Sequence, residues 1–271
     1  MYKDYKKSGI IHKVINQKIR NKLYDGIPAL ELTEFIENEI MLYTKFDINN
    51  PLIAGIGFPV GISINDVAAH FTPSKEHNPI ISDNDVVKID YGVHINGCIS
   101  DGAFSWCPNG EYNNLIKVAE EATNVGIKNA GVDAILGGIG YSIQEVIESS
   151  EIEINGELKP IKSIYDLCGH QIKQFIIHAG KAVPNIGISY MERMKENEVY
   201  AIETFPTTGN GAIFEDSECN HFMIDKLYDG EGSTNYDPLG SAFEKIYDIR
   251  FSLPFCLIFQ YLIINILKNI L

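Results

Sequence analysis

The sequence predicts an α+β fold with a mixed or antiparallel sheet. Two observations carry this prediction: apolar residues recur at helical spacing in several segments, and two strand-rich segments are each centred on an Asn-Gly pair. The predicted order is helix, helix, hairpin, helix, helix, hairpin, strand, which differs from the regular alternation of a parallel sheet. Because no short-period repeat, linker or low-complexity stretch interrupts the chain, we expect a single domain over residues 1–271.

Two helices are predicted at the start of the chain. Residues 5–23 and residues 29–43 both carry apolar side chains three or four residues apart, and Gly26 and Pro28 separate the two segments. Between residues 52 and 70 the pattern becomes irregular and rich in glycine and other small residues.

The clearest local signal is a β-hairpin over residues 86–104, which read VVKIDYGVHINGCISDGAF. Asn-Gly between two β-rich runs is the strongest short-range signal for a hairpin turn. Helices are predicted over residues 113–129 and 140–149. A second hairpin is predicted over residues 151–162, and residues 198–205 are predicted to form a strand that leads into a glycine-rich turn.

The charge balance excludes one broad class of partner. Lys and Arg number 22 against 36 Asp and Glu, and the resulting net charge of -14 argues against binding to a nucleic-acid backbone, which needs a basic face. The acidic residues are spread along the chain, which favours a solvated surface over a dedicated cation-binding surface. The five cysteines form no C-x-x-C pair and the N-terminus has no apolar signal segment. We therefore expect a cytoplasmic protein.

The last segment, residues 251–271, is unusually apolar and reads FSLPFCLIFQYLIINILKNIL. Its length is close to the minimum for a membrane span, but Pro254, Gln260 and Asn265 interrupt it. We expect a buried or misread tail and no membrane insertion, with a membrane anchor as the alternative.

Two carboxylates of the first hairpin are candidates for metal binding. A two-residue turn at Asn96-Gly97 pairs Asp90 with Ala103, which places Asp101 on the same face as Asp90 at about 7–8 Å between Cα atoms. Two carboxylates on one half-buried face repel unless a cation or a shared proton neutralises them. An Asp at a solvent-facing edge or on a turn is the competing interpretation.

Further candidate ligands lie near the C-terminal half of the chain. His170 follows Gly169, His178 lies in IIHAGK, and Glu203 lies inside the apolar strand VYAIETF. Each alone has a structural explanation, such as a satisfied core histidine or an ion-paired glutamate. Together with the two aspartates they form a set that suits divalent Mn, Fe, Co or Zn, and a two-metal site of this kind performs hydrolysis.

Four segments resemble methionine aminopeptidases of type 2 in motif, order and spacing. They are GFPVGISINDVAAHFTP, KIDYGVHINGCISDGAF, GHQIKQFIIHAGKAVPN and NEVYAIETFPTTG. The resemblance covers roughly residues 5–256, and it implies the pita-bread fold, in which two pseudo-symmetric α+β halves flank a metal site. The histidine pattern of AAHFTP argues against the related proline-specific aminopeptidases and creatinases.

The resemblance also implies a role for each matching residue. Asp90, Asp101, His170 and Glu203 would bind two divalent ions, and Glu203 would help to activate a metal-bridged hydroxide. His70 and His178 would contact the substrate peptide, with His178 stabilising the tetrahedral intermediate. The pocket for the methionine side chain would be shaped by Phe58, Ile177 and His221.

One departure concerns the C-terminus. The family has a fifth ligand, a bridging Glu on the last core strand, but this sequence has no Asp or Glu after Asp248. We therefore expect the closing strand of the second half to be missing. An altered reading of a normal gene and a shortened, inactive paralogue are the two explanations.

The expected function is removal of the initiator methionine from nascent proteins whose second residue is small. The partners would then be peptides with N-terminal methionine and nascent chains, which would bring the protein close to the ribosome. The alternative is a catalytically impaired pita-bread protein with a binding or regulatory role.

Overall fold

The structure is a computed structural model that describes residues 1–215, 219–223, 246 and 248–256. Its contacts divide the chain into two compact units. Unit 1 contains residues 1–104, residues 174–176 and the described residues after 217, and unit 2 contains residues 105–173 and 177–216. The expectation of one peptidase domain over residues 1–271 stays a prediction.

Two helices of unit 1 confirm the predicted N-terminal pair. They are α1 (Tyr2–Lys22) and α2 (Ala29–Thr44), and they pack against each other. Both bury residues four apart, which lie on one face of a helix. The buried residues at this spacing are Ile11, Ile15 and Ile19 of α1 and Leu32, Ile36 and Ile40 of α2.

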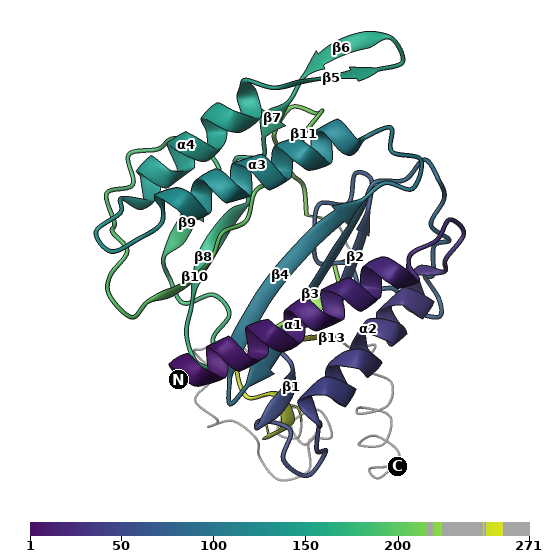
Figure 1. Ribbon diagram of the computed structural model, residues 1–271, viewed down its shortest axis with the longest axis vertical. Helices are drawn as coiled ribbons and strands as arrows, with labels where there is room; N and C mark the ends of the chain where they lie inside the picture. Colours follow the sequence, from purple (N-terminus) through teal and green to yellow (C-terminus); the bar gives the residue numbers. More distant parts are fainter. Residues whose placement is uncertain (216–218, 224–245, 247, 257–271) are drawn as a thin grey trace, which may run out of the picture. The chain divides into compact units, whose positions relative to one another are not determined.

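The sheet of unit 1 is built around β3 (Val87–Ile95), which lies against α1 (Figure 1). β3 pairs with β4 (Cys98–Trp106), and also antiparallel with β1 (Ala54–Ile56) and β2 (Gly61–Ile64). Between β3 and β4, Asn96 and Gly97 have φ angles of 49° and 74°, as a two-residue hairpin turn requires. The predicted hairpin is confirmed.

β1 and β2 were not expected, because the sequence between residues 52 and 70 has no strand periodicity. Both are short, of three and four residues, and nearly every residue in them is buried. Strands covered on both faces lack the polar–apolar alternation by which a strand is recognised. Their pairing with β3 therefore decides their conformation.

A small ladder in unit 1 joins β12 (His221–Phe222) to β13 (Phe255–Cys256). Of the predicted apolar tail, residues 251–271, only residues 251–256 are described, and Leu253 and Cys256 are buried there. The rest of the tail, the predicted loss of the closing strand and the missing fifth ligand lie outside the described residues. Within the part of the chain that is described, no helix is both long enough and apolar enough to cross a bilayer.

Unit 2 is built on α3 (Asn113–Asn129) and α4 (Leu136–Glu148), which pack against each other. α3 coincides with its prediction, and α4 begins four residues earlier than predicted. The core between them contains Val118, Ala122, Ile139, Ile143 and Ile147.

The strands of unit 2 pair antiparallel. β8 (Cys168–Ile172) lies between β9 (Ala182–Pro184) and β10 (Val199–Ala201), and β7 (Lys162–Ser163) pairs with β11 (Pro206–Thr207). β5 (Glu151–Ile154) and β6 (Glu157–Pro160) form the second predicted hairpin. These pairings confirm an α+β fold with antiparallel sheets.

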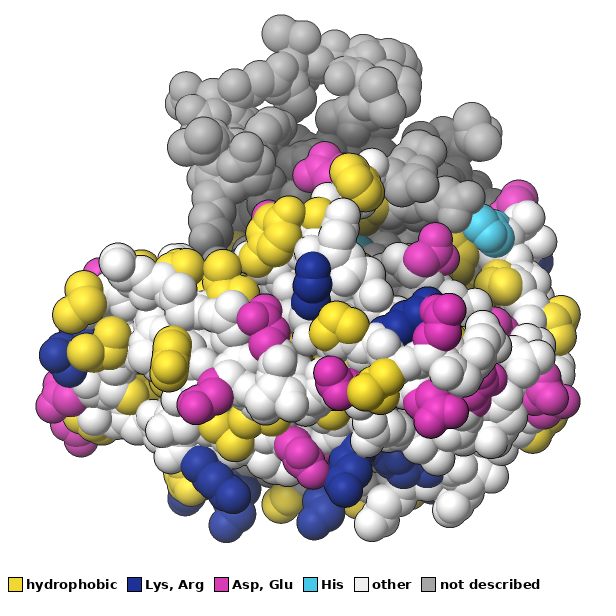
Figure 2. Space-filling view, turned by 90° about the horizontal axis from the view of Figure 1, so that it is seen from above, with side chains coloured by type: hydrophobic (Ala, Val, Ile, Leu, Met, Phe, Trp, Pro, Cys, Tyr) yellow, Lys and Arg dark blue, Asp and Glu magenta, His cyan; other side chains and the backbone are white. Residues whose placement is uncertain are grey.

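The acidic side chains on the face shown in Figure 2 are dispersed. Acidic side chains alternate there with hydrophobic and uncharged ones. This distribution agrees with the expectation that the excess negative charge forms a solvated surface.

Candidate functional site

Asp90 of unit 1 lies on the face of β3 that points away from α1. Its neighbour Tyr91 stacks on His12 of α1, with ring centroids 4.1 Å apart. Because successive side chains of a strand point to opposite faces, Asp90 points to the other side of the sheet. Asp101 lies on β4. Its position on the same face as Asp90 stays a prediction, which rests on the hairpin register that a two-residue turn at Asn96-Gly97 implies.

Two predicted substrate residues of unit 1 lie side by side. The rings of His70 and His221 are stacked, with centroids 5.4 Å apart. His221 Nε2 is 2.7 Å from Oγ1 of Thr72, whose backbone N–H also donates to the side chain of Asn220 at 2.9 Å. Burial, together with the nearby His70, lowers the pKa of His221 to about 3, so its imidazole is neutral.

His221 and Asp90 approach the same point of β2. Gly61 lies opposite Asp90 in the β2–β3 ladder. A methyl group at Gly61 would lie 3.6 Å from Cβ of Asp90 and 3.8 Å from Cε1 of His221. Phe58, the other predicted pocket residue of this unit, is buried, with its ring over Gly92 of β3. Unit 1 therefore gathers an aspartate, two histidines and an aromatic ring around β2 and β3.

Unit 2 brings together His170 and Glu203. His170 Nε2 lies 2.8 Å from Glu203 Oε1, and the two side chains are 12% and 31% exposed. The ring of His178 approaches His170 edge-on, with centroids 4.4 Å apart at 85°. Ile177, predicted to line the methionine pocket, is buried.

Glu203 lies beyond the end of β10, whereas the sequence predicted a continuous strand over residues 198–205. β10 ends at Ala201, which pairs with His170. The chain then leaves β8 and pairs with β7 instead, because Phe205 accepts a hydrogen bond from Ile164 and β11 follows directly. The predicted length of this strand was wrong.

Backbone packing fixes the distance between His170 and Glu203. Gly169 has no side chain, and a methyl group there would clash with the carbonyl oxygen of Ala201 and lie 3.0 Å from the backbone nitrogen of Glu203. On the other side, Thr204 donates to the carbonyl of Ala119 in α3 at 2.9 Å. Gly169 and Thr204, which are adjacent to His170 and Glu203 in sequence, are therefore both held in place.

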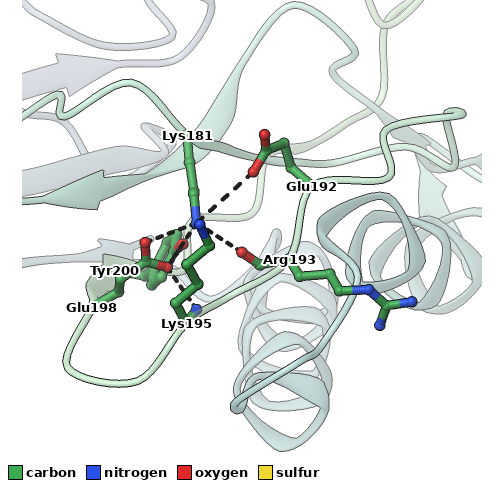
Figure 3. A network of polar contacts seen from close by, with 6 residues as sticks. All are labelled: Lys181, Glu192, Arg193, Lys195, Glu198 and Tyr200. Carbon is green, nitrogen blue, oxygen red and sulfur yellow. Dashed lines mark hydrogen bonds and ion pairs between the residues drawn. The ribbon is translucent and has the colours of Figure 1, made fainter.

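A second polar cluster in unit 2 surrounds Lys181, three residues after His178 (Figure 3). Lys181 Nζ donates to both oxygens of Glu198, at 2.8 and 2.9 Å, and to the carbonyl of Arg193 at 2.8 Å. Glu198 also accepts from the hydroxyl of Tyr200 at 2.6 Å and from the backbone of Lys195 at 2.7 Å. Sequence reasoning missed this cluster, because lysine and glutamate 17 residues apart give no local signal.

These contacts hold the pKa of Glu198 well below its ordinary range. Desolvation by burial raises this pKa, but the hydrogen bonds from Lys181, Tyr200 and the backbone of Lys195 together lower it to about 2. Lys181 belongs to the segment after His178, and Glu198 directly precedes β10. The ion pair therefore ties together the two segments that carry His178 and Glu203.

The solved structures that this chain resembles have the predicted pita-bread fold. A solved structure of methionine aminopeptidase from Thermotoga maritima matches with a TM-score of 0.65 at 21% identity, over 79% of this chain and 82% of that one. A thermophilic Arx1 structure matches with a TM-score of 0.69 at 16% identity, over 94% of this chain and 75% of that one. This likeness establishes the predicted fold.

The chain belongs to metallopeptidase family M24, whose model matches residues 3–230. It is 40% identical over 255 residues to methionine aminopeptidase 2 of Clavispora lusitaniae, which covers 94% of this chain and 58% of that protein. It is 44% identical over 223 residues to methionine aminopeptidase 2 of Dictyostelium discoideum, covering 82% of this chain and 50% of that protein. The chain thus spans about half the length of these relatives.

Membership of a metallopeptidase family implies a divalent metal ion. The residues of unit 2 fit such an ion, because His170 and Glu203 offer an imidazole nitrogen and a carboxylate oxygen in contact, on side chains that solvent reaches. This is a donor set for first-row divalent metals.

Proposed function

We propose that this chain is a methionyl aminopeptidase, which removes N-terminal methionine from peptides and nascent proteins whose second residue is small. The observation that carries the proposal is the contact of 2.8 Å between His170 and Glu203 in a member of metallopeptidase family M24. The relatives named methionine aminopeptidase 2 support the choice of substrate.

The proposed metal ligands are Asp90, Asp101, His170 and Glu203. They comprise three carboxylates and one imidazole, which suits two ions of Co, Zn, Mn or Fe. When bound, such ions polarise a peptide carbonyl and lower the pKa of water to near neutrality.

The protein's own groups would then bind and orient the peptide. Glu203 would accept a proton from the attacking water, since it is a carboxylate that solvent reaches. His178, next to His170, would donate a hydrogen bond to the carbonyl oxygen of the scissile bond as negative charge develops there. His70 would also contact the substrate peptide.

Selection of methionine is assigned to Phe58, Ile177 and His221. Phe58 and Ile177 are buried apolar side chains, and His221 is held neutral. An apolar pocket suits the flexible thioether of methionine. We also propose a cytoplasmic location close to translating ribosomes, where N-terminal methionine is first exposed.

The test is hydrolysis of a Met-Gly-Xaa peptide by the purified chain with added Mn²⁺ or Co²⁺. Glu203→Gln keeps the size of the side chain but removes the base, so kcat should fall by about 10²–10⁴-fold. Glu157→Gln is the matched control, because Glu157 is an exposed residue of β6 in the same unit, and it should leave kcat unchanged. A Met-Leu-Xaa peptide should be cleaved much more slowly than Met-Gly-Xaa.

Equal activity of Glu203→Gln and the unaltered chain would overturn the proposed role of Glu203. If the unaltered chain binds Met-Gly-Xaa but cleaves it with neither ion, the result would instead support a binding or regulatory pita-bread protein.

A further inference from the structure

Behind the two aspartates of unit 1, a histidine of α1 contacts both strands of the hairpin. His12 Nε2 lies 3.1 Å from the carbonyl oxygen of Tyr91 and 3.2 Å from that of Gly102. Tyr91 directly follows Asp90, and Gly102 directly follows Asp101. One imidazole nitrogen therefore contacts the backbone next to each of the two proposed carboxylate ligands.

The tautomer of His12 follows from its partners. Carbonyl oxygens only accept hydrogen bonds, so Nε2 must carry the hydrogen and donate it to both. Burial lowers the pKa of His12, although hydrogen bonding to Tyr91 and the charge of Asp101 oppose this effect. The ring is accordingly a neutral donor.

The ring of His12 is held in place from both sides. It stacks on Tyr91 at an angle of 4°, and the hydroxyl of Tyr91 donates to the backbone carbonyl of His12 at 2.9 Å. On the other strand a methyl group at Gly102 would lie 2.7 Å from Cε1 of His12, so only glycine leaves room for the ring. The packing and the hydrogen bonds thus depend on each other.

Contact of one nitrogen with both carbonyls also bears on the register of the hairpin. A two-residue turn at Asn96-Gly97 places Tyr91 opposite Gly102, as a shared donor requires. A slip of one residue would turn every side chain of β4 to the other face. His12 therefore opposes any shift that would separate Asp101 from Asp90.

We infer that His12 is a positioning residue, which holds Asp90 and Asp101 in register from the opposite face of the sheet so that both can bind a divalent cation. The inference rests on the proposed metal-binding role of the two aspartates. In this role His12 would act through the backbone of Tyr91 and Gly102 and not as a metal ligand.

The test compares two variants of His12 that differ in the N–H group. His12→Leu keeps apolar volume but has no donor, whereas His12→Gln places an amide N–H near the position of Nε2. Ile15→Ala is the control, because it truncates a fully buried side chain one turn further along α1 without touching the carbonyls of the hairpin. Each protein is titrated with Mn²⁺ in a calorimeter. Hydrogen exchange of residues 87–106 is measured in the metal-free protein.

His12→Leu should weaken Mn²⁺ binding about 10–100-fold, the range for groups that orient metal ligands. It should also speed exchange in β3 and β4. The Mn²⁺ affinities of His12→Gln and of Ile15→Ala should both stay within about threefold of that of the unaltered chain. The inference is overturned if His12→Leu and Ile15→Ala behave alike in both measurements, or if His12→Gln is no better than His12→Leu. If the unaltered chain binds no Mn²⁺, the proposed function fails and the exchange data alone decide the role of His12.

Discussion

The ion pair between Lys181 and Glu198 should be one of the larger single contributions to the stability of unit 2. Both side chains are only 16% exposed, so water screens the pair weakly. Lys181 donates three hydrogen bonds of 2.8 to 2.9 Å, two of them to the carboxylate. Hydrogen bonds to charged groups contribute about 1.5–3 kcal/mol, so Lys181→Met should lower the free energy of unfolding by about 2–3 kcal/mol.

The assay is urea unfolding at pH 7, with Lys162→Met as the control, because Lys162 is an exposed lysine on β7 of the same unit. For a protein of this size the loss corresponds to a fall in Tm of about 4–12 °C. Lys162→Met should change the free energy of unfolding by less than about 0.5 kcal/mol.

At acid pH, the free energies of unfolding of Lys181→Met and the unaltered chain should differ less than they do at pH 7. The pKa of Glu198 is about 2 in the folded protein and 4.5 as its ordinary value. A depressed carboxyl pKa stabilises the folded state above the unfolded pKa, and this stabilisation is lost as the pH falls from about 5 towards 2. At pH 3.5 the effect of Lys181→Met should therefore be about 1 kcal/mol smaller than at pH 7. An effect that is the same at both pH values, or no larger than that of Lys162→Met, would refute the reasoning.

Three further substitutions test other parts of the structure. Ile143→Ala, in the fully buried core of unit 2, should cost about 2–5 kcal/mol in urea unfolding, and a loss below about 1 kcal/mol would contradict this packing. Gly169→Ala should push the carbonyl of Ala201 away and abolish cleavage of Met-Gly-Xaa, so retained activity would show that the backbone there can adjust. Thr72→Val removes the hydroxyl 2.7 Å from His221, and KM for the same peptide should rise about 3–10-fold with little change in kcat.

Much of the fold could be predicted because its strongest signals are local. The buried face of α1 repeats every four residues, and the turn at Asn96-Gly97 needs only two residues to define it. β1 and β2 could not be predicted, since their conformation depends on pairing with β3. The predicted end of β10 was wrong for a similar reason. The strand stops where the chain leaves β8 and begins to pair with β7, and no feature of residues 198–205 indicates this change of partner.

The candidate site divides in the same way. Asp90 and Asp101 became candidate ligands through the hairpin, and His170 and Glu203 through their chemistry and sequence context, whereas the role of each residue came from the family resemblance. Long-range contacts of neighbouring residues were missed. His12 lies 79 residues from Tyr91 in sequence, and Thr72 lies 149 residues from His221. Contacts over such distances leave no periodic pattern in the sequence.

Unit 1 holds the N-terminus, yet it is the last unit for which synthesis supplies all the parts. The carbonyl of Gly102 is synthesised 90 residues after its partner His12, which takes about 5–18 s at typical elongation rates. The guanidinium of Arg250, which donates to the carbonyl of Ile56, is synthesised 194 residues later, after all of unit 2. Until β3 has been made, the apolar face of α1 lacks part of its final cover. The order of synthesis therefore completes unit 2 before unit 1, and the apolar faces of the N-terminal helices stay partly uncovered until the strands of unit 1 follow them.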